Sequence, residues 1–217
     1  MSSKSKTPEP RVMREQSIPT TYLPDGRVHV PLPVDLNAAE TQAIADLKAR
    51  ILAACKEQGV DERYADPVDY DYVRFLRARK WVIEDAYKMM IATLLWRTAN
   101  KPDLITEEEI EAENRKGKVY FQDYDFDGNL ICWIKVRLHN SGESDFELLK
   151  KLCMYWMEQG FRHVRPDRPG TCVLFDMKGF GLANMVRQNR DKDISRRFLI
   201  LSSISNQHLL TVFLAPQ

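Results

Sequence analysis

Apolar residues recur at helical spacing in the first half of the chain. On one face of the first segment they stand at Ile44, Leu47, Ile51 and Leu52. Asn37, with Glu40 three residues later, forms the pair expected of a capping box at a helix start. Gly59 is typical of the position after a helix end, since glycine tolerates the left-handed backbone found there. The pattern predicts a helix that begins after Asn37 and ends before Gly59.

The pattern between residues 71 and 97 predicts two helices joined by a tight elbow. The first helix is basic and carries Arg74, Arg77, Arg79 and Lys80. The pattern breaks at Trp81, Val82 and Ile83, and it restarts at Glu84 and Asp85, acidic residues that suit a helix N-terminus. The stripe of the second helix is formed by Ala86, Met89, Met90, Thr93, Leu94 and Arg97. Two ordinary surface helices with solvated charges are the alternative interpretation.

The period of the pattern changes after one more short helix, which is predicted from Thr106 to before Gly117. Residues 118–121 and 130–138 are rich in β-branched and aromatic residues and flank the turn DFDGN, which predicts a β-hairpin. The helix that follows has its apolar face at Phe146, Leu149, Leu152, Cys153, Trp156 and Met157. Residues 171–175 form a short apolar run typical of a buried strand. This order predicts an α/β domain after a helical module.

Two sequence motifs resemble a known family. RFLRARKW at 74–81, followed by LLWR at 94–97, resembles the N-terminal helical element of the CRAL-TRIO family. DFDGN at 125–129 and VLFDMKGFGLANM at 173–185 resemble the lipid-binding domain of the same family. This family contains the yeast-type phosphatidylinositol transfer proteins and their retinal- and tocopherol-binding relatives, and the resemblance is to the fungal branch.

The resemblance implies a four-part organisation. Residues 1–37 are expected to be a flexible proline-rich arm, and residues 38–114 the CRAL-TRIO helical module. Residues 115–185 are expected to be the first part of the mixed α/β lipid-binding domain. Residues 186–217 match nothing in the family, so the domain is expected to be incomplete and truncated after Met185.

The function implied by the resemblance is the binding and intermembrane transfer of a phospholipid, with phosphatidylinositol as the first candidate. Such a protein is not an enzyme and uses no cofactor. Its partners are expected to be the phospholipid and, transiently, a membrane surface, and its location cytoplasmic and peripheral. The alternative is a truncated, lipid-free interaction module that binds protein or a membrane surface.

The resemblance also assigns candidate residues for the lipid site. Arg79 falls on the arginine that contributes to phosphoinositide headgroup binding, because a guanidinium offers a rigid fork of donors to phosphate. An ion pair of Arg79 with Glu84 or Asp85 is the open alternative. Arg74 and Arg77 are expected to be solvated or paired surface charges.

The candidates on the choline-headgroup side have lost most of their polar groups. Phe121 and Cys132 stand where proteins of dual specificity carry tyrosines. Thr171 and Val173 stand where the proteins of dual specificity carry residues with a hydroxyl group, and of the two only Thr171 has one. This argues against tight phosphatidylcholine binding.

Composition limits the other classes of function. The net charge of +1 gives no global attraction to nucleic acid, and no apolar run is long enough for a transmembrane segment. The four cysteines form no CxxC pair and are expected to be reduced and buried, and no catalytic or metal-binding motif is present. Asp123, Asp125 and Asp127 copy half of a calcium loop, but Ile134 replaces the required glutamate. These acids are expected to shape the hairpin turn.

The C-terminal tail contains apolar runs with no family-like partner. We expect the strand at residues 171–175 to have an open edge, and the chain to self-associate because of it. In the alternative, residues 209–214 pair as a substitute strand and cover that edge.

Overall fold

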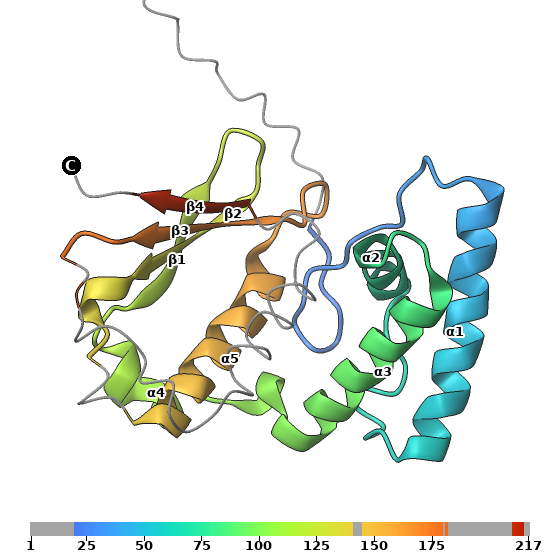
Figure 1. Ribbon diagram of the computed structural model, residues 1–217, viewed down its shortest axis with the longest axis horizontal. Helices are drawn as coiled ribbons and strands as arrows, with labels where there is room; N and C mark the ends of the chain where they lie inside the picture. The colour runs from blue at the N-terminus through green and yellow to red at the C-terminus, as the bar shows by residue number, and fades with distance from the viewer. Residues whose placement is uncertain (1–19, 141–144, 180, 182–209, 215–217) are drawn as a thin grey trace, which may run out of the picture.

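The computed structural model describes residues 20–140, 145–179, 181 and 210–214 (Figure 1). Helices α1 (Ala38–Gln58), α2 (Asp69–Ala78) and α3 (Ile83–Asn100) lie at one end of the molecule, and a β-sheet lies at the other. The short helix η1 (Pro102–Leu104) and helix α4 (Glu107–Asn114) connect the two parts. Helix α5 (Phe146–His163) lies between the sheet and the first three helices in this view.

The start and end of α1 follow from its neighbouring residues. The Asn37 side chain accepts a hydrogen bond from the Glu40 backbone N–H at 2.9 Å, and the Glu40 carboxylate accepts one from the Asn37 N–H at 3.0 Å. Gly59 follows the helix with φ of 70°. The predicted capping box and helix end are confirmed.

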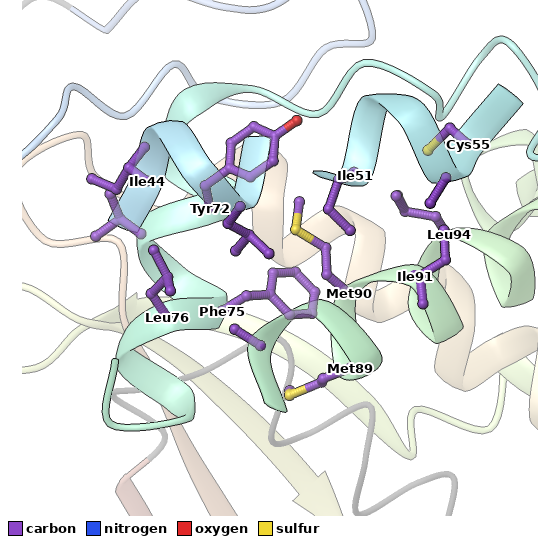
Figure 2. Close-up of a cluster of buried hydrophobic side chains, with 14 of the residues drawn as sticks. Ile44, Ile51, Cys55, Tyr72, Phe75, Leu76, Met89, Met90, Ile91 and Leu94 are labelled. Carbon is purple, nitrogen blue, oxygen red and sulfur yellow. The ribbon is translucent and has the colours of Figure 1, made fainter. Parts of the chain in front are cut away.

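One apolar core holds α1, α2 and α3 together. Figure 2 shows Ile44 and Ile51 of α1 facing Tyr72 and Phe75 of α2 and Met90 of α3. All of these side chains are buried, because the apolar stripe of each helix turns toward the other two. The predicted stripe of α3 is confirmed from Ala86 to Leu94, while Arg97, at its end, takes part in an ion pair described below.

The sheet has the strand order β1-β2-β3-β4. Strands β1 (Val119–Tyr124) and β2 (Leu130–Lys135) form the predicted antiparallel hairpin, and β3 (Thr171–Asp176) pairs parallel to β2. The second strand ends earlier than predicted, because the chain turns into the short helix η2 (Val136–Leu138). The parallel β2–α5–β3 unit gives the predicted α/β layer.

The prediction that β3 has an open edge is wrong. Strand β4 (Leu210–Leu214) pairs parallel to β3, with Cys172 opposite Leu210 and Asp176 opposite Leu214. Its β-branched and aromatic residues suit a strand, and pairing satisfies the backbone groups that an open edge would expose. The alternative of a substitute strand is therefore the correct one. Among the described residues β4 now forms the edge of the sheet, so self-association stays a prediction. The remainder of the predicted tail, residues 186–209, lies outside the described residues.

The predicted flexible arm is also wrong for its C-terminal part. Tyr22 and Val28 form an antiparallel bridge around a turn at Gly26, whose φ is 82°. The Val28 N–H donates to the Phe161 carbonyl at 2.9 Å, and Val28 is only 5% exposed. The proline-rich composition hid this segment because its partners, in α5 and β2, lie more than a hundred residues away. Residues 1–19 of the arm lie outside the described residues.

Candidate functional site

Four of the five predicted site residues share one face of the sheet. Phe121 stands opposite Cys132 across β1 and β2, and Cys132 stands opposite Val173 across β2 and β3. Residues in register on neighbouring strands point to the same side, so these three form a row. Thr171 lies two residues before Val173 and faces the same side. The structure thus brings together residues that lie up to 52 positions apart in the sequence.

Helix α5 packs against this face of the sheet. The Phe121 ring lies 5.7 Å from the Trp156 ring, centroid to centroid, in an edge-to-face arrangement. Gly160 permits this approach, because a Cβ atom there would lie 3.2 Å from the Phe121 ring. Burial raises the pKa of the Cys132 thiol to about 12 and that of Cys153, on α5, to about 11. Both thiols therefore stay protonated at neutral pH, and both are free cysteines as predicted.

Arg79 lies apart from this row, at the end of α2. Its guanidinium donates one hydrogen bond to the neighbouring Ala78 carbonyl at 3.3 Å, and it makes no ion pair with any described residue. The predicted alternative partner Glu84 is bound by Arg50 at 2.8 Å and by Lys88 at 3.4 Å, and Asp85 does not pair with Arg79 either. An arginine with no carboxylate partner keeps its donors available for a phosphate.

A cavity of about 300 Å³ lies between α2, α3, α5 and the N-terminal segment. Its apolar wall includes Met90, Leu94, Met157 and Phe161. None of the five predicted site residues lines it. Its volume is at the lower end of the range for drug-sized ligands, so a phospholipid with two acyl chains exceeds it.

Ion pairs border this cavity, and the sequence analysis predicted none of their partners, only that Arg74 would be solvated or paired at the surface. Arg97 donates two hydrogen bonds to the Glu158 carboxylate, at 2.7 and 3.0 Å. Asp71 accepts from Arg74 at 2.7 Å and from Arg27 at 3.3 Å. The signal for the Arg97–Glu158 pair was an acidic residue directly after the apolar run at residues 152–157, but its partner lies 61 residues away.

Burial and pairing act in opposite directions on these groups. Burial alone would raise the pKa of Asp71, but the charges of Arg74 and Arg27 outweigh burial and lower it. Burial alone would lower the pKa of Arg97, but its hydrogen bonds to Glu158 raise it. Each of these buried groups therefore stays charged because of its partner. The Arg97–Glu158 pair joins the helical module to α5, and the Arg27–Asp71 pair joins it to the N-terminal segment.

The acidic hairpin turn is held by hydrogen bonds between its own residues. The Asp125 carboxylate accepts hydrogen bonds from the backbone N–H groups of Asp127 and Asn129, at 3.0 and 2.8 Å. Burial alone would raise the pKa of Asp125, but the hydrogen bonds from Asn129 and the backbone lower it. The turn-shaping role predicted for this acid is confirmed, and the described residues contain no cluster of three or more potential metal ligands.

Two domain profiles match the chain. The CRAL/TRIO domain matches residues 114–201, and the CRAL/TRIO N-terminal domain matches residues 44–92. Together the two matches cover more than half of the chain. This protein belongs to the CRAL-TRIO family. The CRAL/TRIO match continues past Met185, where the resemblance of the motifs ended, and the predicted boundaries at 37, 114 and 185 stay predictions.

The CRAL-TRIO relatives include fungal proteins, in agreement with the predicted branch. A CRAL-TRIO domain-containing protein of Schizosaccharomyces pombe, C3H8.02, is 31% identical over an alignment of 129 residues, which covers 55% of this chain and 29% of that protein. Phosphatidylinositol transfer protein CSR1 of Eremothecium gossypii is 30% identical over an alignment of 125 residues, which covers 52% of this chain and 29% of that protein. The chain thus spans less than a third of the length of either relative.

The CRAL-TRIO fold is also found by structural similarity. The crystal structure of Sfh5 superposes with a TM-score of 0.58 at 18% identity, and the superposition covers 84% of this chain and 72% of that one. This likeness confirms the predicted α/β class with its N-terminal helical module. Among the described residues of this CRAL-TRIO protein, every helix is too short or too polar to cross a membrane.

Proposed function

We propose that this protein binds a phospholipid and transfers it between membranes, without catalysis, and that phosphatidylinositol is the preferred lipid. The observation that carries the proposal is the row of Phe121, Cys132 and Val173 with Thr171 on one face of the sheet. These positions were assigned from the family resemblance alone, and their shared face supports a common role. A relative named as a phosphatidylinositol transfer protein, CSR1, supports the lipid class.

The chemistry of these residues suits acyl chains and argues against a choline headgroup. The row presents an aromatic ring, a protonated thiol and a valine, and only Thr171 offers a hydroxyl. Each buried CH₂ of an acyl chain contributes about 0.8 kcal/mol to binding. Arg79, which has no carboxylate partner, is the proposed contact for the phosphate.

A second candidate function is a lipid-free interaction module that binds a protein or a membrane surface. The observation that favours it is the packing of α5 on the same face of the sheet, where the Phe121 ring contacts Trp156 and faces Gly160. A face filled by helix side chains leaves less room for acyl chains. In this case the helical module would act by its surface alone.

Native mass spectrometry after mild lipid extraction separates the two candidates. We expect the purified chain to carry one phospholipid, and to take up phosphatidylinositol in preference to phosphatidylcholine. Val173→Phe, on the proposed face, should lower lipid occupancy, whereas Leu174→Phe, on the opposite face of the same strand, should not. A folded chain that stays empty in the presence of both lipids would support the lipid-free module.

A further inference from the structure

Cations without a carboxylate partner gather at one point of the helical module. Between residues 38 and 114, most basic side chains pair with an acid, namely Lys48, Arg50, Arg63, Arg74, Lys88, Arg97 and Lys101. Four basic side chains of this described range form no ion pair: Lys56, Arg77, Arg79 and Lys80. Three of these four, Arg77, Arg79 and Lys80, belong to the elbow, defined here as residues 77–83, where α2 ends and α3 begins.

The backbone of this elbow is held in one conformation. The Trp81 N–H donates to the Leu76 carbonyl at 2.8 Å, and the Lys80 N–H donates to the Arg77 carbonyl at 3.1 Å, with Lys80 at φ of 51°. This is the Schellman arrangement that ends many helices. It fixes the path of the chain, so the cations of the elbow stay together on a short segment instead of spreading along a helix.

The elbow also presents apolar surface beside its cations. Val82 is 49% exposed, and Trp81 is only partly buried against the core of the helical module. The nearest acid on α3, Glu84, is already paired with Arg50 and Lys88. Asp85 is the one neighbouring carboxylate on α3 that no cation of the described residues neutralises, so the elbow keeps an excess of positive charge.

We propose that this elbow docks the protein onto the surface of a membrane that contains anionic lipids. The proposal rests on the proposed function and locates the contact that lipid transfer requires. The charge of the elbow is complementary to an anionic lipid surface, where each lysine or arginine strengthens binding by about fivefold. An aromatic ring and an aliphatic side chain next to cations suit the boundary between headgroups and acyl chains. The whole chain has a net charge of only +1, so this local excess determines which side of the protein meets the membrane.

Arg77 and Lys80 provide a test that leaves the proposed headgroup residue Arg79 intact. We expect the variant Arg77→Glu with Lys80→Glu to lose roughly 25-fold or more in affinity for vesicles of mixed phosphatidylserine and phosphatidylcholine, since two attractive charges become repulsive. Sedimentation with these vesicles, and with vesicles of phosphatidylcholine alone, measures the effect. Binding of the parent should weaken as salt is added, because salt screens the attraction between the elbow cations and the anionic lipids. Arg77→Gln with Lys80→Gln is the milder variant if charge reversal prevents folding.

Lys56→Glu is the control for a charge reversal at a helix end, because Lys56 and Arg77 each stand as the basic residue in the last turn of a helix. The loss of favourable interaction with the helix dipole is then the same in both. Lys56→Glu also changes the net charge by the same amount as Arg77→Gln with Lys80→Gln. We expect Lys56→Glu to bind vesicles as the parent does.

Equal vesicle binding by the elbow variant and the parent would overturn the proposal, and so would an equal loss of binding in Lys56→Glu. Binding to an acidic protein without binding to anionic vesicles would overturn it as well. Lipid occupancy by native mass spectrometry is scored separately, so a failure of docking and a failure of the proposed function are distinguishable.

Discussion

Arg79 differs from most arginines of the helical module in what its guanidinium contacts. Its one hydrogen bond goes to the adjacent Ala78 carbonyl, whereas Arg63, Arg74 and Arg97 each bind a carboxylate. A guanidinium without such a partner contributes little to folding stability but can bind a phosphate with full strength.

We expect Arg79→Ala to weaken the binding of phosphatidylinositol by about 1.5–3 kcal/mol, the usual contribution of a hydrogen bond to a charged group. The transfer of this lipid should fall accordingly. The free energy of unfolding should change by less than about 1 kcal/mol, because Arg79 is only half-buried and its removal leaves no carboxylate without a partner. Transfer between labelled vesicles and urea unfolding measure the two effects, and Lys56→Ala serves as the control because Lys56 is likewise without a carboxylate partner. Equal transfer by the variant and the parent, with both folded by circular dichroism, contradicts the role.

Asp71 holds the N-terminal segment on the helical module through an ion pair. It accepts from Arg74 on its own helix and from Arg27 on that segment, and its side chain is largely buried. We expect Asp71→Asn to cost about 3 kcal/mol, because two arginines then lose their shared counter-charge. Hydrogen exchange at the Val28 amide, which bonds to Phe161, should become faster in the variant.

The contribution of Asp71 to stability depends on pH in a defined direction. Its pKa is lower in the folded state than in the unfolded state, so the folded protein binds fewer protons at this carboxyl group. The stabilisation is therefore complete above the unfolded pKa, which is about 3.9, and is lost as the pH falls through the folded pKa. Urea unfolding should show a large difference between the parent and Asp71→Asn at neutral pH and a smaller one in acid. A difference that is the same at both pH values would show that the ion pairs do not act in this way.

At the scale of elements, the contact between α5 and β1 depends on the absence of a side chain at Gly160. Glycine inside a helix costs about 1 kcal/mol relative to alanine, so its presence here requires a compensating contact. The Phe121 ring supplies that contact, since a Cβ atom at residue 160 would lie 3.2 Å from it.

We expect Gly160→Leu to destabilise the protein by about 1–3 kcal/mol, because the added side chain overpacks the space that Phe121 occupies. The combination with Phe121→Ala should recover part of this loss, which a double-mutant cycle in urea measures. Gly160→Ala is the control, with a smaller effect because the ring has to yield by only a few tenths of an ångström. If the costs of Gly160→Leu and Phe121→Ala simply add, the two residues do not share this space.

At the scale of the whole molecule, a largely buried ion pair joins helix α3 of the helical module to helix α5 of the CRAL/TRIO domain. Arg97 of α3 and Glu158 of α5 form a pair with two hydrogen bonds, and the Glu158 side chain is only 7% exposed. The Arg97 guanidinium also lies 5.1 Å from the Tyr64 ring centroid. These contacts hold the two parts in one arrangement around the cavity.

We expect Glu158→Ala to lower the free energy of unfolding by about 3–5 kcal/mol, because Arg97 is then left as a buried charge without its partner. The double variant Arg97→Met with Glu158→Leu should recover most of this loss, since both charges of the pair are removed together and Asp103 keeps its ion pair with Arg63. Chemical denaturation of the two variants and the parent measures the difference. A double variant that is no more stable than Glu158→Ala would mean that packing, and not the unpaired charge, sets the cost.

Local interactions explain what the sequence alone could predict. The Asn37–Glu40 capping pair, the turn at Asp125 and the apolar stripes of α1 and α3 each involve residues within a few positions of one another. Such interactions are determined by side-chain chemistry and helical or strand period, so the helices, the hairpin and the family motifs follow from the order of residues.

Only the tertiary structure decided which distant segments meet. The pairing of β4 with β3, the burial of Val28 against α5 and the Arg97–Glu158 ion pair each join residues that are far apart along the chain. The same holds for the row of Phe121, Cys132 and Val173, which exists only because three strands align in one register. A sequence pattern records the period of each element but not the register or partner of its neighbours, because these depend on the packing of the whole chain.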